Sequence, residues 1–134
     1  MSAQTDISGR IVYAKEGLIA VDKPHGLVST GRDLDDPDCL QFLLQRHYRR
    51  RIWAVHQLDR ETSGLNLFVR RKALVAEWVD RLRLGTKRYL AVVHGQPKPG
   101  LVDAPLGWIE GKGGGRGNWE VHPSGRTAQT EVLL

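Results

Sequence analysis

The most informative part of the chain is the stretch His56-Gln57-Leu58-Asp59-Arg60-Glu61-Thr62-Ser63-Gly64-Leu65. It follows the apolar run 52–55 and leads into the alternating run 65–69, and both runs are typical of strands. Three small turn-forming residues follow the acidic residue Asp59 closely. We therefore predict a strand, a loop and a second strand, an arrangement that can present the acid Asp59 on a rigid support. The alternative is an aspartate that starts a turn and bonds its own backbone.

The composition indicates one soluble globular domain over 1–134. With 134 residues, 40% of them hydrophobic and 26% charged, the chain is long enough for one core and too short for two. No apolar run approaches the roughly 20 residues that span a bilayer. The N-terminus lacks the basic start and apolar core of a secretory signal. Cys39 is the only cysteine, so we predict no internal disulfide, a core position for Cys39 and a cytoplasmic protein.

The positive charge of the chain is concentrated around the opening stretch. The net charge is +5, but residues 46–88 hold twelve basic and four acidic residues and so carry +8. A basic field of this kind raises the local concentration of a polyanion. Arginine dominates, which favours bidentate contacts with phosphate. The alternative is a solvated helix face whose basic end complements the helix dipole.

Outside this stretch, apolar spacing and turn residues predict a series of short elements. They are a hairpin over 10–22 with its turn at 15–17, a helix over 37–48 capped by Asp36, a helix over 74–84 ended by Gly85, a strand over 87–95, an irregular strand over 101–109, a flexible glycine-rich loop over 111–117 and a final strand within 121–132. Lys23 is predicted to end the hairpin in solvent, and the alternative is a contact with phosphate. The histidines are scattered, so no metal site is predicted.

The order of residues in the opening stretch resembles the signature His-Arg-Leu-Asp-x-x-Thr-Ser-Gly of the RluA-like RNA pseudouridine synthases. Gln57 stands where that family has arginine, and the other defined positions match. Three further segments resemble family motifs in the same order along the chain: Lys23-Pro24-x-Gly26, Lys87-x-Tyr89, and Gly125-x-x-Ala128-x-Thr130. The resemblance implies an isomerase that converts a uridine already in RNA to pseudouridine, without a metal or organic cofactor.

The resemblance also assigns roles to individual residues. Asp59 is the expected catalytic residue, acting as nucleophile or as proton acceptor at the sugar of a flipped nucleotide. Tyr89 is expected to stack on the target uracil. His56 and Thr62 belong to the RNA-binding set, and both are also expected to shape the loop. Gln57 keeps a hydrogen-bonding side chain but no charge, so we expect altered RNA engagement, for which Arg60 compensates in part.

We expect an α+β fold with a mixed, mainly antiparallel sheet, flanking helices and a basic cleft. The family has a further basic segment with an arginine that pairs with the catalytic acid, and this sequence stops before it. The fold is therefore expected to be C-terminally incomplete, with unpaired sheet edges through which a homodimer or a swapped assembly forms. The expected partner is structured RNA, either rRNA or tRNA.

Two functions follow from these observations. The first is an RNA pseudouridine synthase, which modifies a uridine in rRNA or tRNA by base flipping. The alternative is a noncatalytic RNA-binding or assembly module derived from such an enzyme, because the arginine segment is not in the sequence. Pseudouridine mapping after incubation with RNA separates the two.

Overall fold

A computed structural model describes residues 6–32, 36–111 and 117–133 of the chain. It divides the chain into two compact units, Met1–Arg88 and Tyr89–Leu134, which we describe one at a time. The single domain over 1–134 stays a prediction. So does the flexible glycine-rich loop at 111–117, because its residues 112–116 lie outside the described part.

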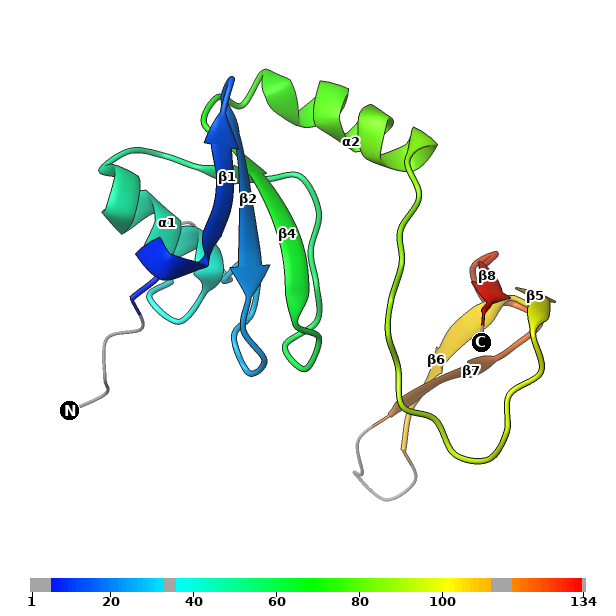
Figure 1. The fold of residues 1–134 in the computed structure, drawn as a ribbon. Coiled ribbons are helices and arrows are strands. Elements are labelled where there is room, and N and C mark those ends of the chain that lie inside the picture. The colour runs from blue at the N-terminus through cyan, green and yellow to red at the C-terminus, as the bar shows by residue number, and fades with distance from the viewer. Residues whose placement is uncertain (1–5, 33–35, 112–116, 134) are drawn as a thin grey trace. The chain divides into compact units, whose positions relative to one another are not determined.

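The first unit is built on a four-stranded antiparallel sheet of order β1-β2-β4-β3 (Figure 1). The strands are β1 (Ile11–Lys15), β2 (Leu18–Lys23), β3 (Trp53–Ala54) and β4 (Gly64–Val69). All four were predicted from the sequence, with β3 shorter than the apolar run that contains it. β2 pairs with β4 from Leu18↔Val69 at one end to Lys23↔Gly64 at the other. This register brings the Lys23 segment beside the start of β4.

The hairpin between β1 and β2 turns at the predicted position. Its two turn residues both have positive φ, 53° for Glu16 and 84° for Gly17. Two consecutive positive φ values are typical of the two-residue type I′ turn, whose twist matches that of the strands. The Gly17 carbonyl also accepts a hydrogen bond of 2.8 Å from the Arg70 N–H, which joins the turn to the end of β4.

The core lies on both faces of the central strand β2. Alternate side chains of a strand point to opposite faces, so Ile19 and Val21 pack in one cluster and Leu18 in the other. The first cluster contains Leu40 and Leu44 of α1 (Leu40–Tyr48). The second takes half-buried side chains from α2 (Leu74–Leu84). Figure 1 shows α1 beside the sheet and α2 following β4.

Both helices were predicted, but the start of α1 was placed wrongly. The N-cap is Cys39 instead of Asp36, and the helix begins at Leu40. Cys39 is extended and forms an isolated bridge with Val28, and its Sγ accepts a hydrogen bond of 3.4 Å from the Phe42 N–H. The Asp36 carboxylate accepts hydrogen bonds from the backbone N–H groups of Arg32 and Asp38 and so stabilises the loop before the helix. Cys39 is buried, as predicted. α2 ends before Gly85, as predicted.

The second unit contains two antiparallel strand pairs. β5 (Gly100–Asp103) pairs with β8 (Gln129–Val132), and β6 (Leu106–Ile109) pairs with β7 (Asn118–Val121). The predicted strand at 87–95 was wrong: residues 86–93 form no helix or strand. Leu90 and Val92 are fully exposed there. A β-strand requires a paired neighbour, and this segment has none among the described residues.

The fold is therefore α+β, as expected. Every strand pairing in the described residues is antiparallel, and the only parallel contact among them is the isolated Val28↔Cys39 bridge. Across 6–32, 36–111 and 117–133, no helix has the length and apolar character needed to cross a membrane.

Candidate active site

The candidate site is the loop between β3 and β4, residues 56–63, which we call the motif loop. Its tip is a turn in which the Thr62 N–H donates to the Asp59 carbonyl oxygen at 3.1 Å. Asp59, Arg60 and Glu61 are exposed. The turn is closed by the backbone of Asp59, and within the described part of the chain no donor bonds its carboxylate. The geometry thus leaves this carboxylate available to a ligand.

A buried polar network fixes the backbone before the tip. The Ser29 Oγ accepts the Leu58 N–H at 2.8 Å, and its one hydroxyl hydrogen faces Asn66 Oδ1 at 2.6 Å and the Leu58 carbonyl at 3.0 Å. The Asn66 amide donates to the His56 carbonyl at 2.9 Å. Ser29 and Asn66 are almost fully buried, so these bonds form away from water. The network holds the residues on both sides of Gln57.

His56 is held as a neutral acceptor. Its Nε2 accepts the Leu67 N–H at 3.2 Å, so the ring hydrogen is on Nδ1. Burial lowers the pKa of His56; a hydrogen bond with the Gln57 backbone opposes this effect, and the charge of Lys87 adds to it. The half-buried ring is therefore part of the support of the loop, which was one of its two predicted roles. Contact of His56 with RNA stays a prediction.

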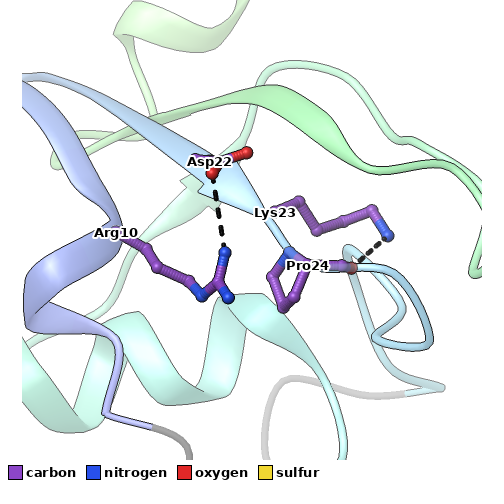
Figure 2. Close-up of polar contacts among 4 residues, drawn as sticks. All are labelled: Arg10, Asp22, Lys23 and Pro24. Atoms are coloured by element: carbon purple, nitrogen blue, oxygen red, sulfur yellow. Dashed lines mark hydrogen bonds and ion pairs between the residues drawn. The ribbon is translucent and has the colours of Figure 1, made fainter.

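The prediction for Lys23 was wrong, because its side chain is fully buried instead of solvated. Its ammonium donates to the carbonyl oxygens of Leu27 at 2.6 Å, Pro24 at 3.2 Å and Arg60 at 3.3 Å. Figure 2 shows the Lys23–Pro24 contact beside an exposed Arg10–Asp22 ion pair of 3.5 Å. Burial lowers the pKa of Lys23 below its ordinary value, and the nearby carboxylates of Glu61 and Asp59 oppose this effect only in part. Lys23 therefore places a positive charge directly beneath the motif loop.

Two reciprocal hydrogen bonds join the motif loop to the loop after β2. The Gly26 N–H donates to the Arg60 carbonyl at 2.8 Å, and the Arg60 Nη1 donates to the Gly26 carbonyl at 3.1 Å. Gly26 has a φ of 86°, a conformation that glycine adopts without strain. The Lys-Pro-x-Gly segment thus supports the turn that carries Asp59. The segment was recognised in the sequence as resembling a family motif, but its role in supporting the turn was not predicted.

The structure brings five of the six predicted site residues together on the motif loop. Gln57 is exposed there and Thr62 is half-buried. The sixth, Tyr89, belongs to the second unit and is 67% exposed. Its predicted stacking on a uracil stays a prediction. Among the described residues, no group of three or more His, Cys, Asp or Glu side chains is arranged to hold a metal ion.

Comparison with known proteins identifies the family. The family model for RNA pseudouridylate synthase matches residues 17–132, which include the motif loop and the Lys-Pro-x-Gly segment that supports it. The chain belongs to the RNA pseudouridylate synthase family. The resemblance seen in four short motifs therefore extends over most of the sequence.

Curated relatives within this family carry pseudouridine synthase names. The chain is 39% identical over 101 residues to the dual-specificity RNA pseudouridine synthase RluA of Escherichia coli K12, covering 72% of this chain and 46% of that protein. It is 36% identical over 107 residues to RluA of Vibrio vulnificus, covering 76% and 42%. The chain thus spans less than half the length of these relatives.

A solved structure supports the fold. Human RNA pseudouridylate synthase domain containing 4 matches with a TM-score of 0.58 and 17% identity, covering 93% of this chain and 53% of that one. At this identity the likeness concerns the fold alone. It agrees with the α+β architecture of the pseudouridylate synthase family.

Proposed function

We propose that this chain carries the catalytic aspartate of an RNA pseudouridine synthase, which isomerises a uridine in rRNA or tRNA to pseudouridine. The observation that carries the proposal is that this family member has the motif loop with an exposed Asp59. Hydrogen bonds with Ser29 and Lys23 hold the backbone of the loop on both sides of Asp59. A reactive group held on a rigid support loses little freedom when substrate binds.

The proposed reaction takes place on a nucleotide that has left the RNA stack. The uracil must be flipped because its glycosidic bond is inaccessible inside a helix, at a cost of a few kcal/mol. The Asp59 carboxylate then acts at the sugar, as nucleophile or as proton acceptor. Breaking the bond from the sugar C1′ to N1, rotating the uracil and bonding its C5 to C1′ gives pseudouridine once the C5 proton has left and N1 has taken up a proton. No atom is gained or lost overall.

The remaining predicted residues serve RNA binding in this proposal. Tyr89 stacks on the target uracil, and Gln57 occupies part of the space left by the flipped base. Lys23 bonds the Arg60 carbonyl and so supports the turn that carries Asp59.

The proposal is tested by incubating the protein with rRNA and tRNA transcripts and mapping pseudouridine at single-nucleotide resolution. We expect one or a few modified uridines. Salt-sensitive RNA binding without any product would instead favour the noncatalytic RNA-binding or assembly module. No binding and no product would contradict both.

We also propose that the protein is cytoplasmic. We propose separately that copies of the chain associate through their sheet edges. Among the described residues, each two-stranded ladder in the second unit has unpaired edges, and Leu101, Val102 and Val121 are exposed on these strands. Such edges pair readily with another chain. Light scattering coupled to size exclusion tests this, and a monomer at all concentrations would contradict it.

A further inference from the structure

A second cluster of positive charge lies in the first unit, outside the motif loop. An open pocket of about 380 Å³ is lined by Phe42, Gln45, Arg46, Arg50 and Arg51. The three arginines are exposed, whereas Phe42 and Gln45 are half-buried. The pocket is therefore an exposed guanidinium cluster beside part of an aromatic side chain, with a volume suited to a nucleotide-sized group.

The dipole of α1 accounts for only part of this cluster. Arg46 and His47 lie in the last turn, where positive charge is favourable. Arg50 and Arg51 lie beyond the C-cap residue Arg49, where the effect of the dipole has declined. Neither forms an ion pair with a described carboxylate. The Arg50 side chain donates one bond to the Arg70 carbonyl at 3.0 Å, and the Arg51 side chain makes no bond within the described residues.

The pocket and the motif loop lie at opposite ends of β4. The motif loop leads directly into Gly64, the first residue of that strand. Arg50 contacts the carbonyl of Arg70, which follows the last residue of the strand. Six residue steps separate Gly64 from Arg70, which corresponds to about 20 Å of strand. The pocket is thus too distant to touch a nucleotide bound at Asp59.

We propose that this pocket binds the RNA backbone at a point remote from the modified uridine. Guanidinium groups form bidentate contacts with phosphate, and an aromatic side chain offers a stacking surface to a base. RNA provides both groups together, whereas an acidic homopolymer such as polyglutamate provides only the negative charge. The inference rests on the proposed function in taking RNA as partner. It adds that the RNA must span both sites, which favours an extended structured substrate.

The test compares two variants with the same loss of charge. Arg50→Gln/Arg51→Gln removes the two pocket arginines. The control, Arg81→Gln/Arg83→Gln, removes two exposed arginines of α2 that pair with Glu77 and Asp80. Binding of a fluorescein-labelled RNA stem–loop is measured by anisotropy over a range of salt concentrations. Thermal unfolding checks that both variants fold, and Arg51→Gln alone replaces the double variant if Arg50 is needed for folding.

We expect the pocket variant to bind about tenfold more weakly, with a salt slope smaller by about 1.4 to 1.8, because two phosphate contacts are lost. The control should keep the wild-type slope. Equal losses in both variants, or no loss in the pocket variant, would overturn the proposal. Competition by polyglutamate as strong as by unlabelled RNA would also overturn it. Pseudouridine assays on the same samples show separately whether the enzymatic proposal holds.

Discussion

The Lys23 ammonium lies 3.3 Å from the carbonyl oxygen of Arg60, although the two residues are 37 positions apart. This contact joins a fully buried cation at the end of β2 to the turn that carries Asp59. Since the same ammonium also bonds Pro24 and Leu27, it fixes two loops at once. The position of the candidate catalytic group thus depends on a residue that never contacts substrate in our account.

Replacing Lys23 with methionine should destabilise the protein by about 2 to 3 kcal/mol, because three carbonyl oxygens lose a charged donor. Urea denaturation measures the free energy of unfolding. The matched control is Lys15→Met, at an exposed position of β1. If both variants unfold within 0.5 kcal/mol of wild type, about the scatter of surface substitutions, the supporting role of Lys23 is refuted.

Ser29→Ala should lower the free energy of unfolding by about 2 kcal/mol, because it leaves the buried Leu58 N–H without its acceptor. Ser63→Ala removes the same atom from an exposed serine of the motif loop and should have little effect. Chemical denaturation of the pair makes the comparison. Equal stability of the two variants would show that the Ser29 network does not hold the loop.

His56 should make stability depend on pH. Its folded-state pKa is lowered by burial, so the unfolded chain takes up a proton first as pH falls below about 6.5. The contribution of His56 is therefore present above that pH and is lost progressively as pH falls toward the folded pKa. His56→Gln should remove this component from denaturation curves recorded between pH 8 and 5 (chosen to bracket about 6.5). His25→Gln, at an exposed position, is the matched control.

Gln57→Arg should strengthen RNA binding, because it adds a positive charge at an exposed position of the motif loop. One added phosphate contact raises the salt slope by about 0.7 to 0.9. Gln96→Arg adds the same charge at an exposed position of the second unit and serves as the control. Anisotropy titrations compare the two. An identical gain in both variants would mean that net charge alone, and not the loop, determines affinity.

The sequence was sufficient for features that depend on neighbouring residues. The hairpin turn, both helices and the motif loop were predicted because their patterns lie within a few residues of one another. Asp59 was assigned from residue order, and its exposed carboxylate agrees with that assignment without testing it. Family membership was also recognisable, because the motifs occur in order along the chain.

Features that depend on distant partners were not predictable in this way. A lysine at the end of a strand is ordinarily solvated, and only the fold brings the Arg60 carbonyl to Lys23. The Ser29–Asn66 contact likewise joins residues 37 positions apart. The segment at 87–95 has the alternation of a strand, but alternation does not supply the neighbour that a strand needs. The helix cap is Cys39 and not Asp36, because a bridge to Val28 holds the backbone of Cys39 extended.

The central claim is that Asp59 acts directly on the reacting nucleotide. The most direct test measures pseudouridine formation and RNA affinity in the same preparations of wild type and Asp59→Asn, a substitution that keeps the size of the side chain and removes its charge. We predict that the variant forms no detectable pseudouridine while its affinity for RNA stays within about twofold of wild type, a difference below 0.5 kcal/mol. Pseudouridine formation by Asp59→Asn at the wild-type rate would contradict the account.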